Sequence, residues 1–132
     1  MVFLRKKLYL FLLLLIVSIY AQENGLQNLT INDGLPSNDI IDIKQDNIGY
    51  LWLATNKGLI KYDGDDFFQI NKQKITTIFI KNSIIYAGLE NGLLIKNKSK
   101  EQFLESKKVI KIVSLKDEIY VCSIQGIYKL KE

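Results

Sequence analysis

The sequence predicts an all-β protein, an incomplete β-propeller of about two and a half to three blades, after an N-terminal signal-peptide helix. Three observations support this fold class. Short runs of β-branched and aromatic residues follow one another, the same anchor residues return at a fixed interval, and a glycine opens one run in every repeat. Each blade is expected to be a meander of four short antiparallel strands.

The N-terminal segment has the features of a secretory signal peptide. Residues 5–7 are basic, residues 8–20 carry no charge, and Ala21 is a small residue before a polar stretch. The apolar run is shorter than the ~20 residues that span a bilayer. We therefore expect residues 1–21 to be a signal peptide and residues 22–132 to be exported to the periplasm. The alternative is an uncleaved anchor that tethers the chain to the membrane.

The basic charge of the chain belongs mostly to this N-terminal segment. The net charge is +4, and loss of the three basic residues at 5–7 would reduce it to +1 (15 − 14). A nearly neutral exported part gives no support for binding to nucleic acid. Six lysines are expected to form a solvated face, at positions 96, 98, 100, 107, 108 and 111.

The composition excludes several kinds of catalytic and metal site. The chain has no histidine, so it cannot supply a serine triad or a histidine-containing metal site by itself. Cys122 is the only cysteine, which excludes an intrachain disulfide, and its place in an apolar alternation predicts a small buried side chain. We expect no catalytic residues, no cofactor and no metal in this chain.

A regular repeat organises the rest of the sequence. The aromatic anchors are equally spaced along the chain, at Trp52, Tyr86 and Tyr120. The glycine anchors have the same spacing, at Gly58, Gly92 and Gly126. Repeats in this size range are typical of propeller blades, whereas a β-sandwich gives no reason for a fixed interval. The predicted units are residues 34–70, 71–104 and 105–132, and the three aromatic anchors are expected to be buried.

Each unit contains a series of strand and turn signals. Apolar runs at 40–43, 75–80 and 109–113 precede the aromatic runs, and the glycine anchor allows the tight turn that follows. Asp63-Gly64 is a further turn signal before a fourth strand at 67–70. Residues 28–31 are expected to form an N-terminal strand that could complete a last blade. Because a propeller closes with 4–8 blades, these units predict an open arc.

Residues 33–67, DGLPSNDIIDIKQDNIGYLWLATNKGLIKYDGDDF, resemble the two-component regulator propeller repeat. The resemblance covers a lead-in at 34–40, a central motif and a glycine-rich close. The central motif is matched by Gln45, Asp46, Gly49, Leu51, Trp52 and Thr55, and the close by Gly58, Leu59, Tyr62, Asp63 and Gly64. The second and third units are degenerate copies. They are assigned by the constant spacing of the repeat, which places their anchors at Tyr86, Gly92, Tyr120 and Gly126.

The resemblance implies a scaffold and a biological setting. The repeat builds the extracytoplasmic sensor domain of bacterial receptors, many of them hybrid histidine kinases of the Bacteroidetes type. It implies a sensor module that binds a small molecule or a glycan, joined to further blades and an output domain, in a receptor that could be a dimer. The alternative is a secreted scaffold protein or a truncated remnant with no signalling output. The residues themselves predict structural roles, with Trp52 between blades and Asp46 bonded to turn amides.

Overall fold

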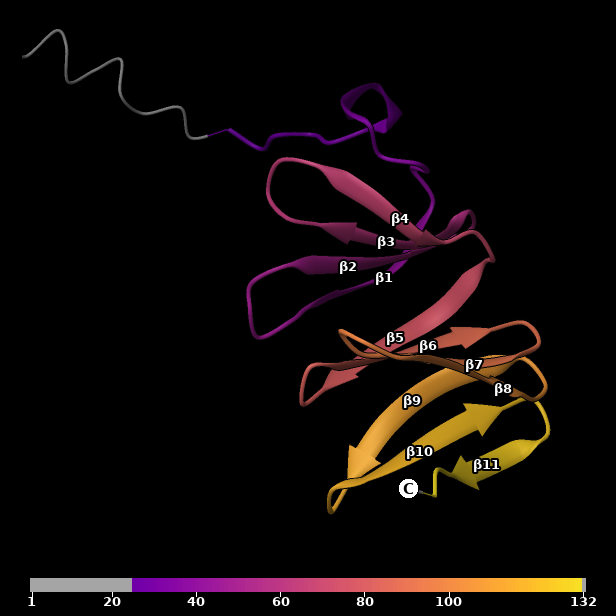
Figure 1. Ribbon diagram of the computed structural model, residues 1–132. Coiled ribbons are helices and arrows are strands. Elements are labelled where there is room, and N and C mark those ends of the chain that lie inside the picture. The colour runs from indigo at the N-terminus through magenta and orange to yellow at the C-terminus, as the bar shows by residue number, and fades with distance from the viewer. Residues whose placement is uncertain (1–24, 132) are drawn as a thin grey trace, which may run out of the picture.

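The computed structural model describes residues 25–131, and the predicted signal peptide at residues 1–21 lies outside them. The regular structure of the described part is almost entirely β, in three antiparallel sheets of four, four and three strands. The sheets follow one another along the molecule in chain order and do not close into a ring (Figure 1). The predicted all-β class and the incomplete propeller are therefore confirmed.

The first sheet is a simple meander with the strand order β1-β2-β3-β4. Its strands are β1 Ile40–Gln45, β2 Leu51–Thr55, β3 Gly58–Tyr62 and β4 Phe67–Asn71. The predicted turn at Gly58 has the backbone that favours glycine, with φ of 135°, and Gly49 in the turn between β1 and β2 has φ of 106°. Each strand alternates between the two faces of the sheet, so both faces carry apolar side chains.

The second sheet repeats this meander with the order β5-β6-β7-β8. Its strands are β5 Ile75–Lys81, β6 Ile84–Leu89, β7 Gly92–Lys96 and β8 Glu101–Glu105. Asn82 and Ser83 form the first turn with φ of 51° and 62°, the pair of left-handed residues that a two-residue hairpin turn requires. This turn is shorter than the one at 46–49 in the first sheet.

The third sheet has three strands among the described residues, in the order β11-β10-β9. They are β9 Val109–Leu115, β10 Glu118–Ser123 and β11 Gly126–Lys129. Lys116 and Asp117 make a left-handed turn like the one in the second sheet. In sheets one and two the third strand pairs with a fourth, whereas β11 pairs with β10 alone within residues 25–131.

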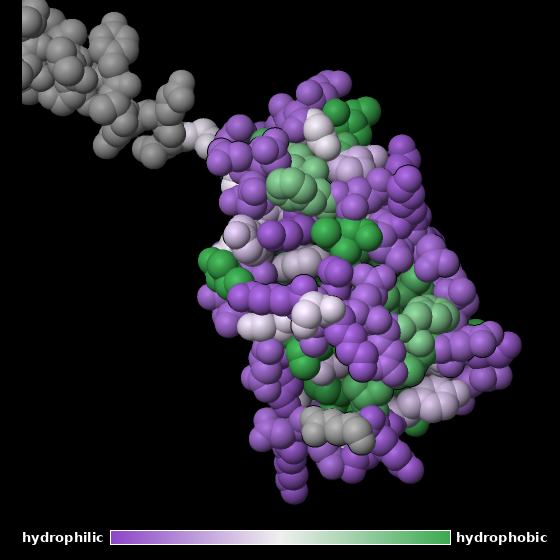
Figure 2. Space-filling view, viewed as in Figure 1, coloured by the Kyte–Doolittle hydropathy of each residue, from purple (hydrophilic) through white to green (hydrophobic). Residues whose placement is uncertain are grey.

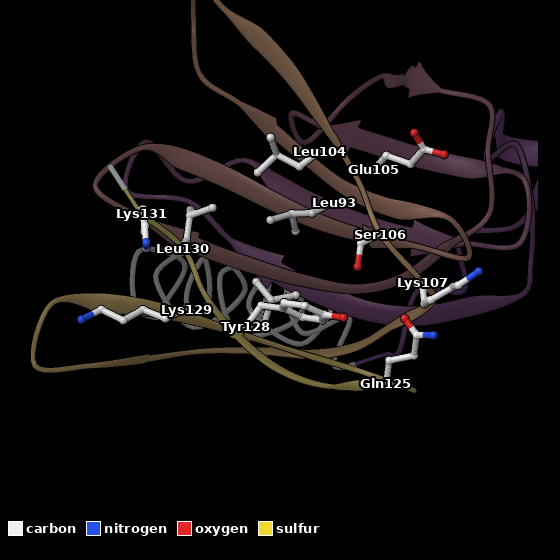
Figure 3. Close-up of a pocket in the computed structure, with 11 residues that line it drawn as sticks. Leu93, Leu104, Glu105, Ser106, Lys107, Gln125, Tyr128, Lys129, Leu130 and Lys131 are labelled. Carbon is white, nitrogen blue, oxygen red and sulfur yellow. The ribbon is translucent and has the colours of Figure 1, made fainter.

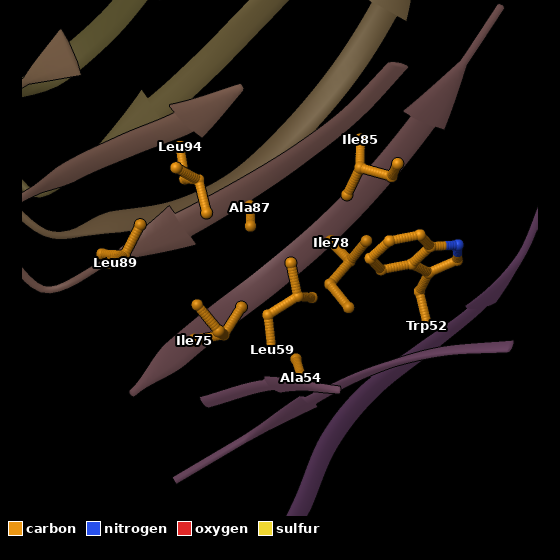
Figure 4. Close-up of a cluster of buried hydrophobic side chains, with 9 residues drawn as sticks. All are labelled: Trp52, Ala54, Leu59, Ile75, Ile78, Ile85, Ala87, Leu89 and Leu94. Atoms are coloured by element: carbon orange, nitrogen blue, oxygen red, sulfur yellow. The ribbon is translucent and has the colours of Figure 1, made fainter. Parts of the chain in front are cut away.

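The core lies between successive sheets. Trp52, Ala54 and Leu59 point from the first sheet toward Ile75 and Ile78 of the second, as Figure 4 shows. The same arrangement recurs one repeat later, where Tyr86 and Leu93 pack against the third sheet. Positions one repeat apart therefore make equivalent contacts, each toward the sheet that follows.

The innermost strands β1, β5 and β9 are joined by hydrogen bonds that involve a side chain. Asp42 accepts a hydrogen bond from the backbone N–H of Ile78 at 3.0 Å, which links β1 to β5. The Thr76 hydroxyl donates to the carbonyl of Val109 at 2.6 Å, which links β5 to β9. These bonds fix the order of the sheets around the inner side of the arc.

The segment before β1 covers the first face of the first sheet. Leu35 is buried there against Leu53 and Ile60. Leu35 lies five residues before the start of β1. The partly buried Ile70 and Leu104 lie five residues before the start of β5 and of β9, the first strands of the next two sheets. Leu35 thus occupies the position that the outermost strand occupies at the two later interfaces.

The strand predicted at residues 28–31 is wrong. Residues 25–30 have no regular structure, and Ile31–Asp33 form a short 3-10 helix, η1. The cause is a capping box, in which the Thr30 hydroxyl accepts from Asn32 N–H while Asp33 accepts from Thr30 N–H. This local hydrogen bonding competes with the extended backbone that a strand needs.

Two side chains predicted to be buried are only half-buried. Tyr120 and Cys122 lie on the outer face of the third sheet, which no described residue covers. Val113 and Ile127 of the same face are 46% and 73% exposed. The surface view in Figure 2 is mostly hydrophilic, with separate hydrophobic patches. The predicted burial of Tyr120 and Cys122 is wrong, because burial of this face depends on a following sheet.

Candidate functional site: the repeat motif and the groove beside it

The turn between β1 and β2 is organised by one carboxylate. Asp46 Oδ1 accepts hydrogen bonds from the backbone N–H groups of Ile48, Gly49 and Tyr50, each at 3.0 Å. Its Oδ2 accepts from the indole Nε1 of Trp52 at 2.9 Å. Both carboxylate oxygens are therefore used, and the turn is fixed to the side chain that packs against the next sheet.

These contacts set the ionisation of the Asp46 carboxyl group. Partial burial raises its pKa, but the hydrogen bonds from Trp52 and from the three turn amides favour the charged form and outweigh that effect. The pKa of Asp46 is therefore lowered from the ordinary value of 3.8. At neutral pH the group is a charged acceptor held by four donors.

The glycine-rich close of the motif also stabilises turns. The Thr55 hydroxyl donates to the carbonyl of Gly58 at 2.9 Å across the β2–β3 turn. Asp63 Oδ1 accepts from the N–H groups of Asp65 and Asp66, and the Tyr62 hydroxyl donates to the carbonyl of Gly64. The motif residues at positions 46–64 thus hold strands and turns in place.

The second and third units keep the anchors but lack the clamp. Tyr86 and Tyr120 follow two-residue turns in which no aspartate corresponds to Asp46. Gly92 and Gly126 retain positive φ, at 159° and 137°. These units therefore differ from the first in the turn that precedes β6 and β10. The glycine turn that follows each of these strands is retained.

A groove opens between the first and second sheets, on the side where these turns lie. Its volume is about 270 Å³, and we call it the Lys61 groove. It is lined by Asp46, Asn47, Ile48, Tyr50, Trp52, Lys61, Ile70, Ser83, Ile85, Lys96, Asn97 and Lys98. The Ser83 hydroxyl donates to Asn47 Oδ1 at 3.1 Å and so joins turns of the two sheets at its mouth.

Lysine side chains dominate the charge of the Lys61 groove. Lys61 Nζ lies 3.5 Å from the centroid of the Tyr50 ring, a cation–π contact. Lys96 pairs with Glu101 at 3.1 Å, but Lys61 and Lys98 form no ion pair with any residue of the described part of the chain. The one acidic side chain in the lining, Asp46, is already occupied by four donors.

Sequence reasoning did not single out this groove. The lysine pattern predicts a solvated face for Lys96 and Lys98, and Lys61 carries no distinctive sequence signal. The information that was lacking is the strand register, which places Lys61 opposite Trp52. The contact between sheets then brings Lys96 and Lys98, from the second sheet and the turn after it, to the same groove.

An equivalent groove lies between the second and third sheets. It has a volume of about 340 Å³ and is lined by Tyr86, Asp117, Glu118, Ile119, Lys129, Leu130 and Lys131. We call it the Tyr86 groove, since a shift by one repeat places Trp52 on Tyr86, Ser83 on Asp117 and Ile85 on Ile119. It mixes two carboxylates with two lysines, and Glu118 is paired with Lys129.

A larger cavity of about 660 Å³ lies at the open edge of the third sheet. Figure 3 shows Leu93 and Leu104 of the second sheet on one side and Tyr128 and Leu130 on the other. The cavity lies where the third sheet lacks a fourth strand among residues 25–131. It is a gap in the packing of the repeat, in contrast to the Lys61 groove, which lies between two four-stranded sheets.

The described residues contain neither a candidate metal site nor a candidate membrane-spanning helix. No group of three or more His, Cys, Asp or Glu side chains in residues 25–131 could hold a metal ion. No helix in that part of the chain is long and apolar enough to cross a membrane.

Comparison with known proteins agrees with the repeat geometry. Residues 34–57, which contain β1, the Asp46 turn and β2, match the family described as the two component regulator propeller. The matched segment is thus similar to a two-component regulator propeller repeat. The propeller repeat supplies both Asp46 and Trp52, so the clamp between turn and indole belongs to the matched region.

Two known proteins are similar to this chain, one in sequence and one in fold. Histidine kinase P4 of Formosa agariphila is 40% identical over 68 residues, which represent 48% of this chain and 5% of the kinase. Crystal structures of the extracellular domain of BT4673 from B. thetaiotaomicron superpose with TM-scores of 0.69 and 0.66, at 20% and 23% identity. They are described as a one component and a hybrid two component system.

The matched regions are small parts of these relatives. The two superpositions cover 79% and 78% of this chain but 16% and 15% of the BT4673 chains. At these identities the likeness establishes the fold, which is that of consecutive propeller blades. The chain thus spans about a sixth of each solved structure.

Proposed function

We propose that this chain is a ligand-sensing propeller module from the extracytoplasmic part of a two-component signal-transduction receptor. The match of residues 34–57 to the two component regulator propeller carries the proposal. It is supported by the similarity to histidine kinase P4 and by the fold shared with an extracellular domain. The proposed location is the periplasm.

In this role the chain performs no chemistry of its own. A small molecule or a glycan binds better to one arrangement of the receptor dimer than to another, and the difference in affinity shifts the balance between them. Further blades and an output domain of the same receptor convert this shift into a signal. Purified protein is accordingly expected to release no sugar from a panel of glycans.

The transcript that encodes the chain offers a direct test. Sequencing past codon 132 is expected to show further repeats, a membrane-spanning segment and an output domain. A second test uses a bacterial strain that carries the full receptor and a reporter gene under the promoter that the receptor controls. Deletion of residues 34–104 should abolish the response of this reporter to the nutrient that induces it. A stop codon at position 133 would contradict the proposal and favour a secreted scaffold or a remnant.

Export is tested separately. Mass spectrometry of the periplasmic protein should find an N-terminus at Gln22 or within a few residues of it, since Ala21 ends the signal peptide. Recovery of intact Met1 in the membrane fraction would instead indicate an anchor.

A further inference from the structure

The Lys61 groove combines a positive rim with an apolar floor. Ile70 and Ile85 contribute apolar surface from facing sheets, and Trp52 contributes part of its indole. Lys61 and Lys98 bring positive charge that forms no ion pair with a carboxylate of residues 25–131. A pocket with an apolar body and a few convergent charged groups is the usual form of a small-molecule site.

The fixed geometry of the groove supports a binding role. Asp46, the one acidic lining residue, keeps its negative charge, but its oxygens accept four hydrogen bonds from the turn and Trp52 and form no ion pair with a lysine of the lining. The three lysines of the lining therefore leave an excess of positive charge. Lys61 is held over the Tyr50 ring, which lowers the entropy that binding would otherwise cost. The turns at the mouth are joined by Ser83 and Asn47.

The Tyr86 groove provides an internal comparison. It is formed by the same positions one repeat later, so its location relative to the strands is the same. Its lining carries Asp117 and Glu118 beside Lys129 and Lys131, and one of these lysines is already paired. Among the described residues, the lining of the two grooves therefore differs in charge, and the excess of lysines is found in the Lys61 groove.

We propose that the Lys61 groove binds a small organic anion that carries a carboxylate or sulfate group on an apolar body. The charged group lies between Lys61 and Lys98, where lysine ammonium groups donate charge-assisted hydrogen bonds. The apolar body lies against Ile70 and Ile85. This inference rests on the proposed sensor function and names the class of ligand that the first two sheets would recognise.

Trp52 allows the binding to be measured directly, because it is the single tryptophan of the chain and lines the groove. The probes are benzoate, phenyl sulfate and the uncharged benzamide. They are titrated into the purified chain carrying Ile127→Lys, a change outside the groove that makes the uncovered face of the third sheet less apolar, at low micromolar concentration while the fluorescence is recorded. A saturable change is expected with benzoate or phenyl sulfate and not with benzamide, and higher salt should weaken it. Comparison of the two anions shows which group the groove prefers.

Variants assign the signal to the groove. Lys61→Met and Lys98→Met should each weaken binding about tenfold or more, as expected for loss of a hydrogen bond to a charged group. Lys131→Met, in the Tyr86 groove, is the matched control and should bind as the parent does. Unchanged thermal melting of Lys98→Met, whose side chain is exposed, separates lost binding from lost folding.

Two results would overturn the inference. Equal binding of benzamide would show that charge is not recognised, and equal loss in Lys131→Met would show that the anions bind without a site. Neither result bears on the proposed sensor function, which is tested separately by the transcript and by the reporter. Conversely, binding in the groove without any reporter response would contradict the sensor function alone.

Discussion

Trp52 and Tyr120 occupy the same position of the repeat but have different surroundings. Trp52 is 6% exposed between two sheets, whereas Tyr120 is half-buried on a face that no described residue covers. Trp52→Ala should therefore lower the free energy of unfolding by ~3–5 kcal/mol, because it leaves a cavity in the core. Tyr120→Ala should cost ~1 kcal/mol or less. Denaturant unfolding checks both, and equal losses would show that the outer face is covered.

The Asp46 clamp makes stability depend on pH. A carboxyl with a lowered pKa stabilises the fold above its unfolded pKa of about 4, and this contribution is lost as the pH falls through the lower folded value. In Asp46→Asn one of the two carboxylate oxygens becomes an N–H₂ group, which cannot accept a hydrogen bond, and the other becomes a neutral acceptor. If that acceptor stays with the turn amides, Trp52 Nε1 loses its partner. We expect a loss of ~1–3 kcal/mol at neutral pH and a flatter acid limb.

Asp65→Asn is the control for this measurement, since the Asp65 side chain is exposed and makes no hydrogen bond or ion pair within residues 25–131. Its stability should follow that of the parent between pH 7 and about pH 3. If Asp46→Asn has the same acid limb as the parent, the clamp does not set the pH dependence.

At the scale of the strands, the fourth strand explains why the glycine anchors differ. A Cβ at Gly58 would lie 1.8 Å from the carbonyl oxygen of Asn71 in β4, while a Cβ at Gly126 would meet nothing within 4 Å. Their φ angles are 135° and 137°, so alanine is strained by the backbone at either position. Gly126→Ala should cost ~1–3 kcal/mol from strain alone.

Gly58→Ala should cost more than ~4 kcal/mol, because β4 must also move away from β3. The difference between the two variants in thermal or chemical unfolding measures the contact with the fourth strand. If both lose the same stability, β4 is not held against Gly58 in solution.

Most strands could be predicted from the sequence because each has its own apolar alternation. β8 could not, since Glu101–Glu105 has one partly buried side chain, Leu104, and is extended because it pairs with β7. The half-buried state of Tyr120 could not be predicted either, because alternation gives the face of a side chain and not what covers it. The Lys61 groove required the register and the packing between sheets, which no single unit contains.

At the scale of the whole molecule, the outer face of the third sheet should drive association. It exposes Ile127, which corresponds to the buried Leu59 and Leu93 of the first two sheets, and with it Val113 and Leu115. Residues 22–132 expressed alone are expected to be insoluble, oligomeric or marginally stable, because uncapped repeats favour aggregation. Ile127→Lys should shift sedimentation toward smaller species. Leu26→Lys, at a fully exposed site elsewhere, should not, and a monodisperse parent would contradict this expectation.

The three-residue connections between sheets, 72–74 and 106–108, have a mechanical consequence. Each runs from the outermost strand of one sheet to the innermost strand of the next, so a force applied to the two ends of the chain passes through the sheets in series. The contacts between sheets involve side chains, whereas strands within a sheet share backbone hydrogen bonds. Stretching should therefore detach one sheet at a time, and each released repeat would lengthen the chain by roughly 110–120 Å. A propeller of this design would yield to tension in equal steps.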